Sequence, residues 1–277
     1  MNSEFKIDNE NIIIFERNNL PDRLISKQEE DKSNFYQEFY DSRASNALMD
    51  LRTTQAEKII VEFSEYFQKG KGLLDIGCGS GIFLEIVKNS YKNLTVKGLE
   101  PAIKNKKDIE SLTLSEYVNS EDHQKYSVVA LLDVFEHQDN PKLTIHQVKK
   151  VLEREGIILI KVPNKDAIMY KIAKWFRFII PSISKEALKR LYQADYPPPH
   201  FFYWNLASIN QFMQENDCKI VKYIYLSDIK IATLHKRLWG ISKLKKILIY
   251  IGTVSLKLVS LSSWSDSILI AVESNEI

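Results

Sequence analysis

The sequence contains only two cysteines among its 277 residues, Cys78 and Cys218. Two thiols so far apart cannot form a disulfide framework or a multi-cysteine zinc site, so a reducing, cytoplasmic setting is expected. The first residues lack the basic start and apolar run of a signal peptide, which agrees with that expectation. The longest apolar stretch, residues 247–261, is interrupted by Lys257. It is too short for a membrane-spanning helix, and none is expected.

Net charge of either sign is almost absent, because the chain carries only +2 overall. This balance hides an asymmetry: residues 161–190 carry a net +6 and residues 229–257 a net +7, so the remainder is close to −11. The same two segments are rich in apolar residues and contain no recognition motif, which argues against a nucleic-acid groove. Hydrophobic residues make up 44% and charged residues 27%, as in ordinary globular proteins.

Glycine is also scarce, with nine in the chain, yet three of them stand at alternate positions in one short segment. Gly77, Gly79 and Gly81 follow an apolar run that ends in Asp75, and a helical apolar pattern begins at Ile82. This pattern predicts a buried strand, a tight turn and the start of a helix. Glycines leave room for a ligand against the backbone, and the first amides of the helix can face its polar groups.

The G-x-G-x-G spacing, with an acid two residues before the first glycine, resembles motif I of class I S-adenosylmethionine-dependent methyltransferases. A nicotinamide-binding turn reads G-x-G-x-x-G instead, so an NAD-dependent oxidoreductase is the weaker alternative. Glu100 ends the next apolar strand, where a carboxylate can accept hydrogen bonds from ribose hydroxyls. The resemblance therefore implies S-adenosylmethionine as the cofactor. The cofactor-binding residues that it implies are Asp75, Gly77, Gly79, Gly81, Glu100, Leu132 and Asp133.

Residues 126–132 form a second continuous apolar run, which is typical of a strand buried on both faces of a parallel sheet. The following residues, Asp133 to His137, closely resemble motif IV of the ubiquinone-biosynthesis-like O-methyltransferases. That resemblance implies that Leu132 and Asp133 border the cofactor and that Glu136 and His137 face the methyl acceptor.

Methyl transfer to a hydroxyl benefits from a general base, and imidazole titrates in the suitable range. His137 is the first candidate, and His200, after a proline-rich segment, is the second. A packing role for either residue stays open. Asp133, Glu136 and His137 could alternatively hold a divalent ion, because oxygen and imidazole ligands suit hard or borderline metals. Catalysis without a metal is the preferred interpretation.

The order of apolar segments predicts an α/β fold: a Rossmann-like, mostly parallel seven-stranded sheet with helices on both faces, an N-terminal helical lid and helical cap insertions. A third strand is expected near residues 111–118, after a lysine-rich helix that ends near Asp108. The expected divisions are 1–52 as the lid, 53–165 and 200–228 as the cofactor-binding core, 166–199 and 229–264 as the insertions, and 265–277 as the last core strand and tail.

The two insertions contain apolar stripes beside basic residues, such as Ile168, Ile172, Trp175 and Phe176 in the first. Packing against each other as a cap over the acceptor is the simpler interpretation. The alternative is peripheral contact of residues 166–190 and 236–261 with an anionic membrane, at its cytoplasmic face, or admission of an anionic, lipid-linked acceptor. The predicted function is methylation of a small molecule, at a hydroxyl of a lipid-like, quinone-like or glycan intermediate. A non-catalytic methyltransferase-like binding module is the other alternative.

Overall fold

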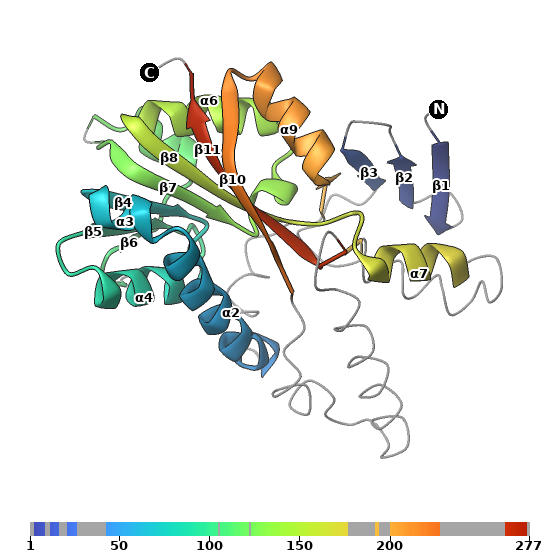
Figure 1. Cartoon of the computed structure of the whole chain (residues 1–277), viewed down its shortest axis with the longest axis horizontal. Coiled ribbons are helices and arrows are strands. Elements are labelled where there is room, and N and C mark those ends of the chain that lie inside the picture. Colours follow the sequence, from blue (N-terminus) through green and yellow to red (C-terminus); the bar gives the residue numbers. More distant parts are fainter. Residues whose placement is uncertain are drawn as a thin grey trace.

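The computed structural model describes residues 3–8, 12–16, 21–26, 43–104, 106–121, 123–176, 192–193, 200–227 and 264–275. Its main feature is a seven-stranded sheet in the order β10-β11-β8-β7-β4-β5-β6 (Figure 1). The strands are β4 (Gly72–Ile76), β5 (Thr95–Leu99), β6 (Ile109–Glu110), β7 (Tyr126–Leu132), β8 (Leu152–Pro163), β10 (Cys218–Leu226) and β11 (Ser267–Ser274).

The sheet is parallel except at one side. Strands β8, β7, β4, β5 and β6 run parallel to one another, whereas β11 is antiparallel to both β8 and β10. This arrangement confirms the predicted Rossmann-like α/β fold. The chain moves outward from β4 in one direction through β5 and β6, and in the other through β7 and β8. In open sheets of this kind, ligands bind beyond the carboxyl ends of the strands where the order reverses, here between β4 and β7.

Helices cover both faces of the sheet (Figure 1). The helices of the core are α2 (Arg43–Glu62), α3 (Ser64–Lys69), α4 (Ile82–Ser90), α5 (Leu114–Asn119), α6 (Pro141–Val151) and α9 (Leu206–Glu215). One hydrophobic cluster joins α2, α3 and α4 to the sheet, and a second joins α5, α6 and α9 to its other face. Apolar residues at helical spacing across α2 and α3 are all buried against the sheet: Ala56, Ile59, Ile60, Phe63 and Phe67.

Side-chain chemistry also explains where two of these helices begin. Asn205 accepts a hydrogen bond from the Ser208 amide at 2.9 Å and is the N-cap of α9. Thr113 accepts from the Glu116 amide, and Glu116 accepts in return from Thr113. This capping box starts helix α5. The prediction of a third strand over residues 111–118 was therefore wrong: β6 ends at Glu110, and the capping box favours a helix. The described residues between Pro101 and Asp108 form turns, not the predicted lysine-rich helix.

A second, smaller sheet lies at the N-terminal side, with the order β1-β2-β3-β9. It consists of β1 (Ser3–Asp8), β2 (Ile12–Glu16), β3 (Asp22–Ser26) and β9 (Phe202–Tyr203), all antiparallel. The sequence analysis expected a helical lid over residues 1–52, so these strands were missed. Residues 27–42 of the expected lid lie outside the described residues.

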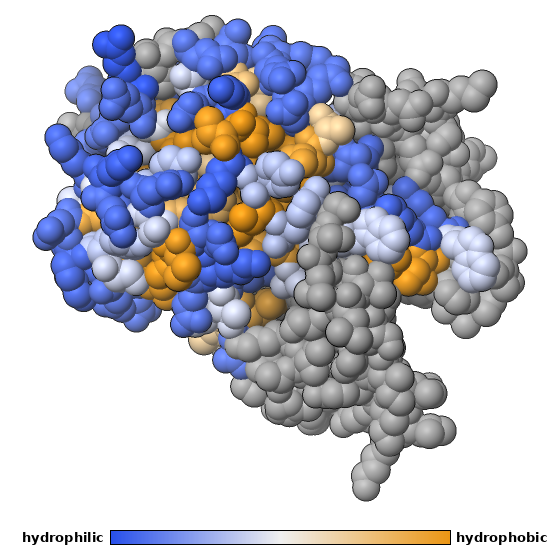
Figure 2. Space-filling view, in the orientation of Figure 1, coloured by the Kyte–Doolittle hydropathy of each residue, from blue (hydrophilic) through white to orange (hydrophobic). Residues whose placement is uncertain are grey.

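Helix α7 (Ile168–Phe176) extends from the end of β8, away from the main sheet (Figure 1). Its buried residues are Tyr170 and Ala173, whereas Trp175, predicted to belong to the packed stripe, is 61% exposed. Figure 2 shows mostly hydrophilic residues on the visible face of the core, with hydrophobic ones surfacing over the sheet. Among the helices of the described segments, none has the length and apolar character needed to cross a bilayer.

Candidate active site

The glycine-rich turn lies at the carboxyl end of β4, at the predicted position. Gly77, Gly79 and Gly81 all have positive φ angles of 66°, 52° and 77°. The amide of Gly77 donates to the carbonyl of Leu99 at 2.7 Å, which fixes the turn against the end of β5. Gly81 is the N-cap residue of α4. The left-handed backbone at all three glycines explains why this segment needs residues without a side chain.

Glu100 holds this turn from the neighbouring strand. Its Oε2 accepts a hydrogen bond from the Gly79 amide at 3.1 Å, and its Oε1 accepts from the Ala102 amide at 3.2 Å. The residue is only 5% exposed. Both carboxylate oxygens are thus oriented by the backbone, and each retains acceptor capacity for a ligand.

Asp75 lies beneath the turn and is buried, with 2% of its surface exposed. Burial, and then the nearby charge of Glu100, raise the pKa of this carboxyl well above its usual value. Burial together with Asp75 and Glu100 also raises the pKa of the Cys78 thiol, which is therefore not a reactive thiolate.

The loop after β7 packs directly against the glycine turn. A Cβ atom placed on Gly77 would lie 2.5 Å from Cγ2 of Val134, closer than real Cβ contacts allow. Asp133, next to Val134, has a φ of 59°, in the left-handed region that non-glycine residues rarely adopt. The two motifs identified in the sequence therefore meet in space, as the resemblance implies.

Lys161 is a site residue that the sequence analysis did not identify. It lies on β8 directly beside Leu132 of β7 and is 4% exposed. Its Nζ donates to Asp133 Oδ2 at 2.8 Å and to Gln55 Oε1 of α2 at 3.1 Å. The available signal was a lone lysine at the end of the apolar run that begins at Ile157, because a charge in a buried strand needs partners.

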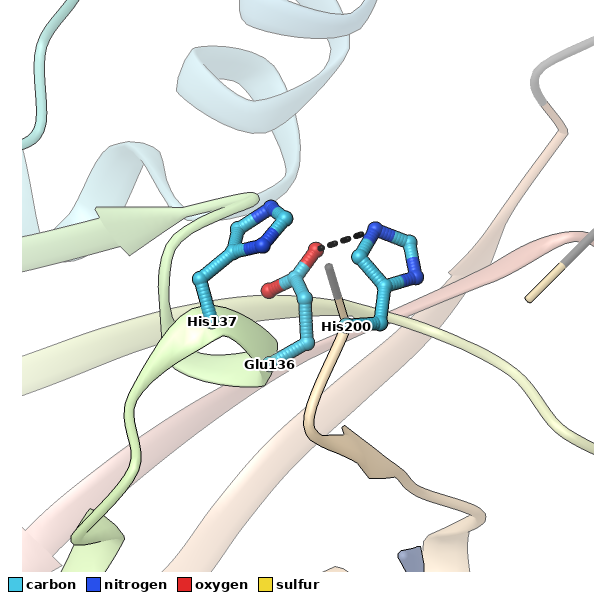
Figure 3. Close-up of side chains that lie close together, drawn as sticks. All are labelled: Glu136, His137 and His200. Carbon is cyan, nitrogen blue, oxygen red and sulfur yellow. Dashed lines mark ion pairs between the residues drawn. The ribbon is translucent and has the colours of Figure 1, made fainter. Parts of the chain in front are cut away.

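Glu136, His137 and His200 form a compact cluster beyond the end of β7 (Figure 3). Glu136 and His137 belong to the single turn η1 (Phe135–His137), and His200 comes from the segment before β9. His200 Nε2 lies 4.0 Å from Glu136 Oε1. The two imidazole rings have centroids 4.7 Å apart and an interplanar angle of 64°. The structure thus brings both predicted histidines together.

The two histidines differ in their environment. His200 is buried, and its pKa is lowered well below its usual value by burial and then by proximity to His137. The His200 carbonyl accepts a hydrogen bond from the Tyr203 hydroxyl at 2.9 Å, which anchors this segment to β9. His137 is half-exposed. His200 therefore stays neutral at neutral pH, whereas His137 is accessible to a ligand.

The residues able to hold a metal differ from the predicted set. One ligand atom each from Glu136, His137 and His200 lie within 4.8 Å of one another, a chemically suitable group of one carboxylate and two imidazoles. The carboxylate of Asp133 is instead bound to Lys161. Among the described residues, the predicted combination with Asp133 does not appear as such a cluster.

Comparison with known proteins agrees with this geometry. A family model described as a methyltransferase domain matches residues 47–223. The ubiquinone biosynthesis O-methyltransferase of Hydrogenovibrio crunogenus is 28% identical over 125 residues, which cover 41% of this chain and 52% of that protein. The chain thus spans about half the length of this curated relative.

Solved structures show the same fold. A SAM-dependent methyltransferase from Archaeoglobus fulgidus is similar with a TM-score of 0.50 and 16% identity, over 88% of this chain and 100% of that one. The plantazolicin methyltransferase BpumL, in complex with a monoazolic desmethylPZN analog and SAH, gives a TM-score of 0.52 and 18% identity, over 88% and 95% of the two chains. At these identities the similarity establishes the fold alone.

Proposed function

The chain belongs to the methyltransferase-domain family, and from this premise we propose that it transfers a methyl group from S-adenosylmethionine to a hydroxyl oxygen of a small molecule. The observation that carries the proposal is the contact between two half-sites. The donor half-site consists of the glycine turn and Glu100, and the acceptor half-site of Glu136 and His137. The glycine turn with Glu100 packs through Gly77 against the loop that leads to Glu136 and His137. A donor and an acceptor bound at these half-sites would be neighbours.

The residues of the turn suit the donor. Glu100 presents a backbone-oriented carboxylate for the ribose hydroxyls, and the positive-φ glycines leave the backbone open to close approach. Asp75 supports the turn from below, while Leu132 and Asp133 border the opposite side. When bound, S-adenosylmethionine supplies a methyl group already activated by its sulfonium sulfur. The protein's main contribution is then alignment of the acceptor oxygen and exclusion of water.

His137 is the proposed general base. One of its ring nitrogens takes the proton from the acceptor hydroxyl, so that the oxygen becomes a better nucleophile. Its half-exposed position permits proton exchange, and the buried carboxylate of Glu136 stabilises the imidazolium that forms. His200 remains neutral and holds the acceptor side of the cluster, because its pKa is lowered.

Metal-assisted activation is the second candidate mechanism for the same reaction. It is favoured by one observation: one ligand atom each from Glu136, His137 and His200 lie within 4.8 Å of one another. A divalent ion held there would bind the acceptor oxygen directly and lower its pKa, so that no histidine would act as a base.

The acceptor that fits best is lipid-like, such as a quinone precursor or a lipid-linked glycan. The named relative acts in ubiquinone biosynthesis, and the basic, apolar segments 166–190 and 236–261 suit contact with an anionic membrane. Exposed Trp175 and Trp264, with Lys171 over the Trp264 ring at 5.2 Å, match the chemistry of a membrane interface. Under this proposal the protein works at the inner face of a membrane, and residues 166–199 and 229–264 contribute to the acceptor side.

The experiment is an assay of methyl transfer from isotopically labelled S-adenosylmethionine to phenols and catechols with and without isoprenoid tails. Mass spectrometry then identifies the methylated atom. Labelled O-methyl product, formed faster with a tailed acceptor on anionic vesicles, is the expected result. Labelling of amine acceptors alone would contradict the proposed hydroxyl chemistry.

A further inference from the structure

Lys161 is a buried charge on the central part of the sheet. Along β8, residues alternate between the two hydrophobic clusters, and Ile157 and Leu159 belong to the cluster beneath α2 and α4. Lys161 is next in that row and points to the same side, at the carboxyl end of the strand. Its side chain is 5% exposed. A lysine in this position must be paired to be tolerated.

Lys161 meets Asp133 through two separate contacts. Its Nζ donates to Asp133 Oδ2 at 2.8 Å, and its carbonyl oxygen accepts from the Asp133 amide at 3.1 Å. Together these bonds hold both the backbone and the carboxylate of Asp133. The residue adopts a φ of 59°, a conformation that costs about 1 kcal/mol or more for a residue with a Cβ atom. Lys161 therefore stabilises a conformation that Asp133 would otherwise tend to leave.

The same ammonium group reaches a second structural element. Its bond to Gln55 Oε1, at 3.1 Å, connects the loop after β7 with helix α2. Gln55 is itself buried, with 8% of its surface exposed. One side chain thus connects helix α2 with the loop after β7.

We propose that Lys161 is a positioning residue of the donor site, which orients Asp133 toward the donor and couples that orientation to helix α2. This inference rests on the proposed function, because it concerns the binding of S-adenosylmethionine. Lys161 holds Oδ2 of Asp133, and the Asp133 side chain as a whole is still 48% exposed, so it remains accessible to a ligand. The charge of the pair is zero, so the buried ammonium does not repel a cationic donor.

A purely structural role would give a different result, because the two partners differ in exposure. The Asp133 side chain is 48% exposed. If Lys161 were replaced by an apolar residue of similar length, Asp133 would remain hydrated rather than buried without a partner. Removing one partner of an ion pair costs most when the other charge is left buried, which does not apply to the half-exposed Asp133, although the buried Gln55 Oε1 loses one donor. Stability and donor binding should therefore separate in such a variant.

The test measures the dissociation constants for S-adenosylmethionine and its demethylated product by calorimetry, together with the thermal unfolding midpoint. Lys161→Met should weaken donor binding about tenfold or more, which corresponds to about 1.4 kcal/mol, with little change in the unfolding midpoint. Lys161→Arg should restore most of the affinity, because the guanidinium keeps the positive charge and can donate to both Asp133 and Gln55. Lys149→Met is the matched control, since that half-buried lysine on α6 donates to the Asn216 carbonyl, at the opposite end of the sheet.

Hydrogen exchange tests the coupling to α2. Ligand binding should slow amide exchange in α2 of the wild-type protein, and Lys161→Met should abolish that protection. Gln55→Leu, which removes only the α2 contact, should lower the protection with a smaller loss of affinity. This variant carries the test if Lys161→Met fails to fold.

Three outcomes would overturn the proposal. These are unchanged donor affinity in Lys161→Met, a loss of affinity that only follows a lowered unfolding midpoint, or the same loss in Lys149→Met. A wild-type protein that binds no S-adenosylmethionine would remove the proposed function and this inference together. Binding by the wild type with an unaffected Lys161→Met would remove only this inference.

Discussion

The imidazole rings of His137 and His200 meet edge to face with their centroids 4.7 Å apart, although they come from separate segments of the chain. The buried carboxylate of Glu136 lies beside both, 4.0 Å from His200 Nε2. Such a group can act as a proton acceptor or as a ligand set. The first two predictions distinguish these uses.

Replacement of His137 tests the proposed base. His137→Asn should lower the turnover number by about two orders of magnitude or more, the usual range for a general base. The affinity for S-adenosylmethionine should be unchanged, because the donor is held by the glycine turn and Glu100. Turnover and calorimetry measure the two quantities separately. His123→Asn is the control, since His123 is exposed and contacts the Ser120 carbonyl, away from the cluster. Wild-type turnover in His137→Asn would contradict the role of this residue.

Removal of metal tests the alternative. We expect activity to survive dialysis against a chelator and to be indifferent to added magnesium or zinc, because His137 suffices as a base. The measurement is the turnover number before and after treatment, with metal content determined by elemental analysis. Loss of activity that a divalent ion restores would favour the ligand role, above all if His200→Ala also weakens the ion's binding.

Replacement of Gly77 tests the contact between the two half-sites. Gly77→Ala combines a positive φ of 66° with a contact of 2.5 Å to Val134, so it should destabilise the fold by about 1–2 kcal/mol from backbone strain alone. Donor binding should fall as well. Adding Val134→Ala should recover the steric part of the loss but not the strain. Urea unfolding and calorimetry check both expectations, and full recovery in the double variant would show that the φ angle is unimportant.

The raised pKa of Asp75 predicts that the stability of the fold depends on pH. Because its pKa is raised by burial and by Glu100, the folded state binds more protons than the unfolded state above the ordinary aspartate pKa of about 3.9. By linkage, this carboxyl makes the protein less stable as the pH rises from there toward its raised pKa. Asp75→Asn should therefore be more stable than the wild type at pH 8, with a smaller difference at pH 5. Unfolding midpoints measured across this range test the sign, and a variant less stable at pH 8 would contradict it.

The sequence predicted the parts of this fold that local patterns specify. Strands β4 and β7 are continuous apolar runs, and the glycines between β4 and α4 have no other common use at that spacing. The segment at 111–118 was misread because a capping box at Thr113 outweighs its modest strand preference. The β1–β3 strands were missed although β1 pairs with β2 and β2 with β3, because each is only five or six residues long; among their partners only β9, where Phe202 pairs with Arg23, lies far away in the sequence.

The residues of the candidate site also fall into two groups, those that a local sequence pattern identifies and those that only tertiary contacts bring together. Asp75, Glu100 and His137 could be identified because each lies at or shortly beyond the carboxyl end of a recognisable strand. The partnership of His137 with His200 and the bonds of Lys161 to Gln55 and Asp133 depend on tertiary contacts between distant segments. No periodicity or spacing within one segment records such contacts.

The most direct test of the account is calorimetric titration of the purified protein with S-adenosylmethionine, its demethylated product and NAD in parallel. We expect binding of the first two and none of NAD. Both affinities should fall at least tenfold in Glu100→Gln, because the glutamine amide cannot accept hydrogen bonds at both of its terminal atoms. Binding of NAD alone would contradict the account. Failure to bind any of the three would point to a module that acts without this cofactor.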